Sequence, residues 1–136
     1  MRVLLDTNII LDIVLEREGF FEDGKRIFML IDASRIEAFI SANTVTDIYY
    51  IVKKVKGNKI AIEIIKDLLS FLGVTKLDKS TLDGALKLLF NDFEDAILNV
   101  SAENNNLEYI ITRNKKDFAK SKLMIMAPKE FLKQIA

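Results

Sequence analysis

The 136-residue chain contains neither cysteine nor histidine. The absence of cysteine excludes disulfide bonds and thiolate metal sites, and it fits a reducing compartment such as the cytoplasm. Without thiolate or imidazole groups, a metal site in this chain has to be built from oxygen ligands. The five glycines form no glycine-rich phosphate-binding loop, which excludes the common nucleotide-binding motifs.

Long apolar runs and an excess of one charge are also missing. No apolar run approaches the length of about 20 residues that a membrane-spanning helix needs, and the segment between Arg2 and Asp6 is too short for a signal-peptide core. We therefore expect no membrane association and a cytoplasmic location. Basic and acidic residues number 20 each, so the bulk charge does not indicate a strongly basic nucleic-acid-binding domain.

Half of the residues are hydrophobic, which is enough for a chain of this length to bury its own core. Short apolar runs alternate with longer amphipathic stretches, and this pattern predicts an α/β fold built from βα units around a parallel sheet. The predicted strands are residues 3–5, 38–41, 74–77, 109–112 and 123–126. The predicted helices are residues 8–15, 21–33, 44–55, 59–72, 80–90 and 92–105, with a last helix after Pro128. No linker interrupts this series.

Gly57 and Asn58 separate two of the predicted helices. Glycine is typical of the left-handed position after a helix, and asparagine is typical of the cap of the next one, so the pair predicts a helical hairpin. Most of the apolar stripe of the second arm is predicted core, and part of it is free for a homodimer contact. The stripe consists of Ile60, Ala61, Ile64, Ile65, Leu68, Leu69 and Leu72.

The first predicted strand ends abruptly in Asp6, which places this carboxylate at the carboxyl edge of the sheet, where open α/β sheets build their sites. The structural alternative for Asp6 is a helix N-cap, because aspartate is common there before an apolar helix. The pattern recurs where a second apolar strand runs into Thr112, Asn114 and Asp117. Two strands that end in polar clusters favour a site.

Three further acids lie near the starts of two predicted helices. Asp47 lies opposite the packed face of its helix, where a solvated acid favoured by the helix dipole is an equally good interpretation. Asp92 and Asp95 both lie at the start of the predicted helix 92–105. Capping explains Asp92 well, but Asp95 borders the packed side of that helix and needs a partner such as a metal ion. Together with Asp6 and Asp117, these acids indicate a site for a hard divalent cation such as Mg²⁺.

Taken in order, these motifs resemble the PIN-domain nucleases, and the likeness runs nearly from end to end. The motifs are Leu-Leu-Asp6-Thr-Asn8, the helical acid Asp47, Asp92-Phe-Glu-Asp95-Ala, Ile-Thr112-Arg113-Asn114-Lys-Lys-Asp117-Phe118 and the closing Pro128-Lys-Glu-Phe131. The resemblance implies a single three-layer α/β/α domain over residues 1–136, with a small parallel sheet of about five strands. It also implies that acids bind one or two Mg²⁺ or Mn²⁺ ions and that the enzyme hydrolyses RNA.

The resemblance implies a role for the acids of the predicted site. The catalytic and metal-binding acids are Asp6, Asp47, Asp95 and Asp117, with Asn114 completing the pocket. Beyond the resemblance, Asn8 and Asp92 are expected to support the site, and Thr7 and Thr112 are candidates to orient a water molecule. For both threonines the better interpretation is a strand-end hydroxyl that satisfies a backbone amide. One departure is that family members commonly carry glutamate at the position of Asp47, and the shorter side chain leaves room for a water between carboxylate and ion.

Basic residues in two places are candidates for phosphate contacts. Arg113, Lys115 and Lys116 flank the predicted pocket and are the expected substrate-binding residues. Lys53, Lys54, Lys56 and Lys59 gather at the hairpin tip, where solvated cations at a helix end are at least as good an interpretation.

The resulting prediction is a metal-dependent endoribonuclease that is the toxin of a VapC-like toxin–antitoxin pair, with RNA as substrate and a small antitoxin as partner. The alternative is a degenerate PIN domain that acts as a non-catalytic RNA-binding or protein-interaction module. Phosphoaspartyl phosphatases also place aspartate at a strand end, but they require a second acid where Asn8 stands. Response-regulator receivers require an acid pair after the first strand, which this chain lacks.

Overall fold

Each of the first three strands is followed by two helices, in the order that the sequence predicts. In the computed structural model, which describes residues 1–135, the strands are β1 (Arg2–Leu5), β2 (Glu37–Ser41), β3 (Gly73–Thr75), β4 (Tyr109–Ile111) and β5 (Met124–Met126). The helices are α1 (Thr7–Val14), α2 (Phe21–Asp32), α3 (Ala42–Lys56), α4 (Asn58–Phe71), α5 (Lys79–Lys87), α6 (Phe93–Asn104) and α7 (Pro128–Ile135), with a short 3₁₀ helix, η1 (Lys115–Phe118). Every predicted strand and helix is present, whereas η1 was not predicted. Residue 136, the last of the predicted domain, lies outside the described residues.

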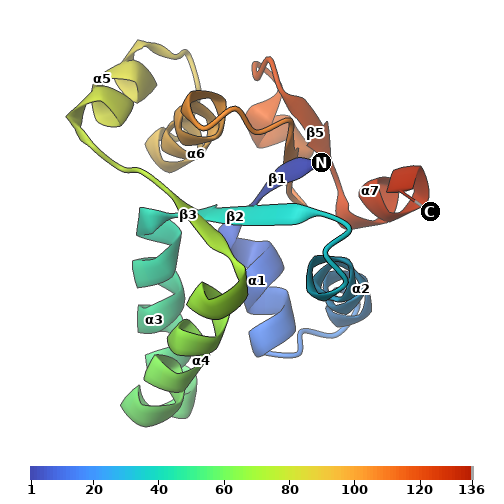
Figure 1. Cartoon of the computed structure of the whole chain (residues 1–136). Coiled ribbons are helices and arrows are strands. Elements are labelled where there is room, and N and C mark those ends of the chain that lie inside the picture. The colour runs from blue at the N-terminus through green and yellow to red at the C-terminus, as the bar shows by residue number, and fades with distance from the viewer. Residues whose placement is uncertain (136) are drawn as a thin grey trace.

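The five strands form one parallel sheet in the order β3-β2-β1-β4-β5 (Figure 1). The chain moves outward from β1 to β3 and later returns to the other side of β1, so the winding direction reverses between β1 and β4. Open α/β sheets bind ligands at the carboxyl ends of the strands beside such a switch point. Leu5 at the end of β1 pairs with Ile111 at the end of β4, which brings the residues that follow them together at this edge.

Helices cover both faces of the sheet, which confirms the three-layer α/β/α architecture (Figure 1). Val3 and Leu5 point into the core shared with α1, α2, α3, α4 and α7, whereas Leu4 points into the core shared with α6 and η1. Helix α5 packs against α6. Val3, Leu4 and Leu5 are fully buried, and each contributes about 1.5–3 kcal/mol by leaving water. Burial on both faces explains why β1 reads as an uninterrupted apolar run.

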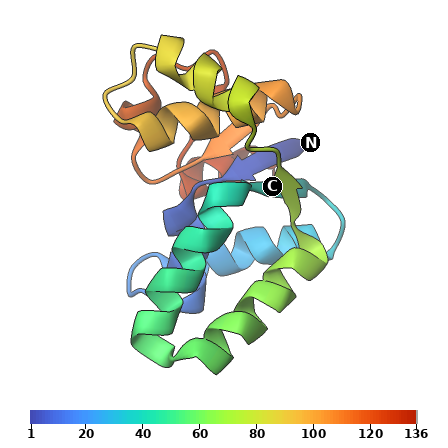
Figure 2. The same cartoon turned by 90° about the vertical axis from the view of Figure 1, so that its left-hand side faces the viewer.

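Helices α3 and α4 form the predicted hairpin, which extends away from the sheet (Figure 2). Gly57 joins them with a φ of 89°, a backbone conformation that glycine adopts without steric cost. The prediction that Asn58 caps α4 is wrong, because Gly57 occupies the cap position. Asn58 is the first residue of the helix, and its Oδ1 accepts a hydrogen bond from the Tyr49 hydroxyl.

The predicted apolar stripe of α4 divides into two parts. Ala61, Leu68 and Leu72 are buried, whereas Ile60 and Leu69 are exposed on the hairpin. Part of the stripe therefore belongs to the core, as predicted, and part of it lies at the surface. Within residues 1–135, none of the helices combines the length and apolarity needed to cross a membrane.

Candidate functional site

A pocket of about 390 Å³ opens at the carboxyl edge of β1. Its walls come from the start of α1, from α3, from α6 and from the loop after β4. The lining residues are Asp6, Thr7, Asn8, Leu11, Asn43, Asp47, Tyr50, Ile51, Glu94, Asp95, Leu98 and Asn114. The fold thus brings three of the four predicted catalytic acids to one pocket and adds a further acid, Glu94.

Asp6 directly follows β1 at the carboxyl edge of the sheet and is also the N-cap of α1. Its role as a cap therefore does not exclude a role in a site at this edge. Its Oδ1 accepts a hydrogen bond from the Thr7 backbone N–H at 2.7 Å, and its Oδ2 accepts one from the Thr112 hydroxyl at 2.7 Å. The side chain is almost completely buried, and this burial raises the pKa of Asp6 even though both hydrogen bonds favour the charged form.

The two threonines at this edge make different contacts. The Thr112 hydroxyl donates to Asp6 and accepts the backbone N–H of Asn114 at 3.0 Å, so both its donor and acceptor capacities are used. The Thr7 hydroxyl lies 2.9 Å from the hydroxyl of Thr44 on α3. Thr112 therefore holds the loop after β4 to the first acid of the site, and Thr7 connects α1 to α3.

Asp95 lies in the first turn of α6, and Asp92 caps that helix by accepting the Asp95 backbone N–H at 3.0 Å. Burial, followed by the negative charge of neighbouring carboxylates, raises the pKa of Asp95 to about 7. Those neighbours are, in decreasing order of effect, Asp92, Asp6, Asp117 and Glu94. Four carboxylates therefore act on Asp95, and negative charge is concentrated at this end of the pocket.

Asp47 lies farther inside its helix than the sequence predicts. Helix α3 begins at Ala42, so Asp47 falls in the second turn, where the helix dipole gives little stabilisation. A hydrogen bond to the Asp47 carboxyl group raises the pKa of Glu94, and burial and the charge of Asp47 act in the same direction. Glu94 was not predicted as a site residue, although its position directly before Asp95 in the first turn of α6 was a signal that could have found it.

Asp117 lies in η1 and is exposed, and it is absent from the lining of the pocket. Its charge nevertheless raises the pKa of both Asp6 and Asp95, although less than burial does. The neighbouring Phe118 is buried, and the centroid of its ring lies 6.1 Å from that of Phe90. Asp117 therefore acts on the site electrostatically from an anchored turn.

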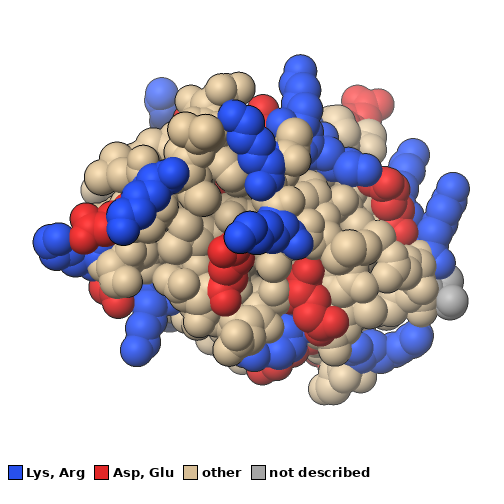
Figure 3. All heavy atoms as spheres, turned by 90° about the horizontal axis from the view of Figure 1, so that it is seen from above, with Lys and Arg blue, Asp and Glu red and all other residues tan. Residues whose placement is uncertain are grey.

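The predicted substrate-binding cations differ in whether an acidic side chain of the protein already pairs with them. Arg113 forms an ion pair with the buried Asp12, whose Oδ2 lies 2.9 Å from its Nε. Lys115 pairs with Glu130 at 2.8 Å, and this contact lowers the pKa of Glu130. Lys116 is exposed. Acidic and basic side chains are interspersed on the face seen from above, on the side of α5 and α6, without a continuous basic surface (Figure 3).

The donor set of the pocket fits a hard divalent cation, because it consists of carboxylate and amide oxygens. Burial, and after it the charge of neighbouring carboxylates, raises the pKa of Asp6 and Asp95, and a bound cation would favour the charged form of both groups. Across the described part of the chain, no three acids are drawn together as a ready ligand cluster. The pocket therefore fits a divalent cation in the type and charge of its oxygen ligands.

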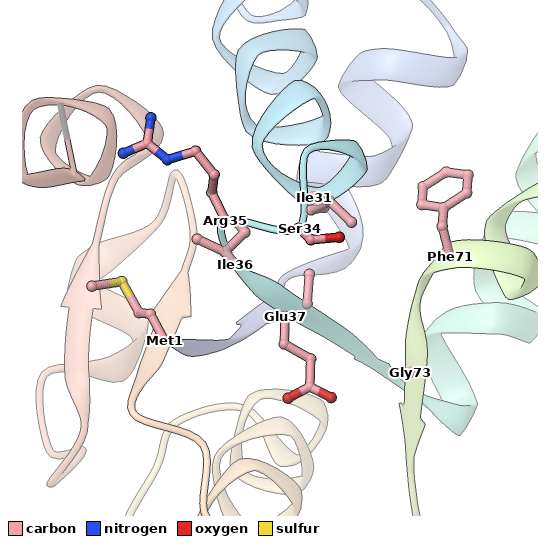
Figure 4. A pocket seen from close by; sticks show the side chains of 9 residues that line it. Met1, Ile31, Ser34, Arg35, Ile36, Glu37, Phe71 and Gly73 are labelled. Atoms are coloured by element: carbon pink, nitrogen blue, oxygen red, sulfur yellow. The ribbon is translucent and has the colours of Figure 1, made fainter.

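A second hollow of about 380 Å³ lies at the opposite, amino edge of the sheet, around Ile31 and Gly73 (Figure 4). Its charged side chains are engaged outside the hollow. Arg35 donates to the backbone carbonyl of Ile135 at 3.4 Å, and Glu37 pairs with Arg2 at 3.2 Å. The carboxyl edge is therefore the better candidate for chemistry.

The chain is similar to known proteins along most of its length. The PIN domain family model matches residues 2–116, which include Asp6, Asp47 and Asp95 and end one residue before Asp117. Ribonuclease VapC1 of Aquifex aeolicus (strain VF5) is 25% identical over 135 residues, which cover 96% of this chain and 92% of that protein.

Solved structures agree with this match. A toxin–antitoxin complex from Klebsiella pneumoniae contains a chain that is 25% identical, with a TM-score of 0.69 and coverage of 93% of this chain and 97% of that chain. VapBC-1 from nontypeable Haemophilus influenzae has the same fold at 19% identity, with a TM-score of 0.70 and coverage of 95% and 99%. The resemblance predicted from the sequence is confirmed, and the chain belongs to the PIN domain family.

Proposed function

We propose that this PIN domain is an endoribonuclease that depends on Mg²⁺ or Mn²⁺. The observation that carries the proposal is the convergence of Asp6 and Asp95, both with raised pKa values, on one pocket at the switch point of the sheet. Strongly perturbed carboxylates in a cleft are typical of functional sites. The similarity to Ribonuclease VapC1 supports RNA as the substrate.

In this proposal Asp6, Asp47, Asp95 and Asp117 hold the ion, and Glu94 adds a fifth carboxylate on the side of Asp47. A bound divalent ion would lower the pKa of a water molecule and stabilise negative charge on the phosphate.

The chain's own residues prepare the site. Hydrogen bonds from Thr7 and Thr112 fix the Asp6 carboxylate and favour its charged form, which offsets part of its burial. The side-chain oxygens of Asn8 and Asn114, which also line the pocket, provide uncharged donors there.

Two exposed residues are suited to bind the nucleic acid. Tyr50 lines the pocket and is 67% exposed, so its ring is available to stack on a base. Lys116 is exposed on η1, beside Asp117, and is available for a phosphate contact. Lys115 becomes available only when its pair with Glu130 opens.

We further propose that the chain is the toxin of a toxin–antitoxin pair. The solved structures that share its fold include toxin–antitoxin complexes. Tyr50 and Ile51 form an exposed apolar rim next to Asp47, and an antitoxin segment seated on this rim would cover the acids. The cytoplasmic location and the homodimer stay predictions.

Cleavage of a structured RNA by the purified protein tests the proposal, with Mg²⁺, with Mn²⁺ and with EDTA. We expect cleavage with either ion, none with EDTA and none by Asp95→Asn. The matched control is Asp67→Asn, which changes an exposed acid on α4 and should leave cleavage unchanged. Failure of the wild type to cleave RNA, together with a melting temperature that neither ion raises, would favour the non-catalytic module instead.

A further inference from the structure

Asp12 is a buried acid to which the sequence drew no attention. It lies on α1 with 3% of its side chain exposed, and it is not among the residues that line the pocket. Its carboxylate is shared by two guanidinium groups. Arg113 contacts it through Nε at 2.9 Å and Nη2 at 3.1 Å, and Arg17 contacts it through Nη1 at 3.4 Å. Removing these charges from water is costly, so a buried ion-pair cluster adds little net stability to the fold. A role in positioning neighbouring residues is the alternative.

Both arginines connect Asp12 to residues at the pocket. Arg113 is flanked in the chain by Thr112, which donates to Asp6, and by Asn114, whose N–H is held by the Thr112 hydroxyl. Arg17 donates to Oδ1 of Asn8 at 3.0 Å. The pocket is therefore tied to Asp12 on two sides.

Arg113 is held on its other side as well. Its guanidinium carbon lies 3.9 Å from the centroid of the Phe20 ring, a stacking contact that suits the planar arginine side chain. Contacts with Asp12 and Phe20 therefore occupy the Arg113 guanidinium within the protein.

We propose that Asp12 is a positioning residue for the site. Through Arg113 it holds the loop of residues 112–114 against α1, and through Arg17 it orients Asn8. This assigns Arg113 to the support of Thr112 and Asn114 and not to a substrate phosphate. The effect on metal binding rests on the proposed function, whereas the effect on the loop does not.

Amide hydrogen exchange of the metal-free protein tests the effect on the loop. In Asp12→Asn and in Arg113→Lys, which keeps the charge but loses the planar fork, we expect the Asn114 amide to exchange about tenfold faster while the Ile110 amide in β4 is unchanged. Glu130→Gln is the matched control, because it weakens the exposed pair with Lys115, the residue that directly follows the loop, and should leave the exchange of the Asn114 amide unchanged. Unchanged exchange at Asn114 in Arg113→Lys, or equal acceleration at Ile110, overturns the proposal.

Titration of Mn²⁺ without RNA tests the effect on the site. We expect Asp12→Asn and Arg113→Lys to bind Mn²⁺ about tenfold more weakly than the wild type, although neither residue is a proposed ligand. Wild-type affinity in both variants overturns the inference and leaves the proposed function intact. A wild type that binds no Mn²⁺ refutes the proposed function, and the exchange experiment still decides the role of Asp12.

The kinetics of Arg113→Lys separate positioning from substrate binding. A positioning role predicts a lower kcat with little change in KM. A raised KM with unchanged kcat and unchanged Mn²⁺ affinity identifies Arg113 as a phosphate contact and overturns the proposal.

Discussion

Replacing Asp95 by asparagine should stabilise the metal-free protein at neutral and alkaline pH while abolishing RNA cleavage. The substitution keeps the shape of the side chain and removes a negative charge from a site already crowded with carboxylates. Among the contacts of the described residues, the Asp95 carboxylate makes no hydrogen bond or ion pair that asparagine would lose. The change in stability therefore reports mainly the removed charge.

The magnitude follows from the pKa of Asp95, which rises from its ordinary value of 3.8 to about 7 on folding. Because the folded state then binds a proton more tightly than the unfolded chain, stability falls as the pH rises through this interval, and the full cost is present above about pH 7. A rise in the pKa from 3.8 to about 7 corresponds to about 4 kcal/mol at most. Asp95 is partly exposed, and solvent screening reduces the expected effect to about 1–2 kcal/mol.

Urea unfolding in EDTA from about pH 4 to about pH 8.5 measures this difference. The stability of Asp95→Asn relative to the wild type should be near zero at about pH 4, rise with pH and level off above about pH 7, where the melting temperature should be higher by about 3–8 °C. Asp67→Asn should show no such trend. A difference that is independent of pH, or a variant less stable than the wild type at about pH 8, would refute the electrostatic reasoning.

Other substitutions test further parts of the molecule. Asp6→Asn should abolish cleavage while the far-ultraviolet circular dichroism of the fold is retained. Thr112→Val should cost about 1–3 kcal/mol in urea unfolding and weaken Mn²⁺ binding, because Asp6 loses a donor and the Asn114 N–H loses its acceptor; unchanged stability and affinity would contradict this role. Gly73→Ala should cost about 1–3 kcal/mol without changing kcat, because its Cβ would lie 2.4 Å from the Phe39 ring; wild-type stability would show that this ring moves aside freely.

Periodicity and strand ends were sufficient to predict much of this protein. The uninterrupted apolar run before Asp6 identified a buried strand, and the fixed direction of that strand placed its last carboxylate at the carboxyl edge of the sheet. The repeat of the pattern before Thr112 identified the neighbouring strand end, and the two side chains are hydrogen-bonded. Such features depend on local order along one segment, which the sequence encodes directly.

Contacts between segments depended on the tertiary structure. Glu94 became part of the site because α3 and α6, which cover opposite faces of the sheet, both reach its carboxyl edge, where the Glu94 carboxyl group meets Asp47. Asp12 and Arg113 are 101 residues apart, and they meet because β4 pairs with β1 in the sheet. In the sequence Arg113 is a loop cation free to bind phosphate. In the folded protein a buried carboxylate engages it, because only the sheet order determines which charges are neighbours.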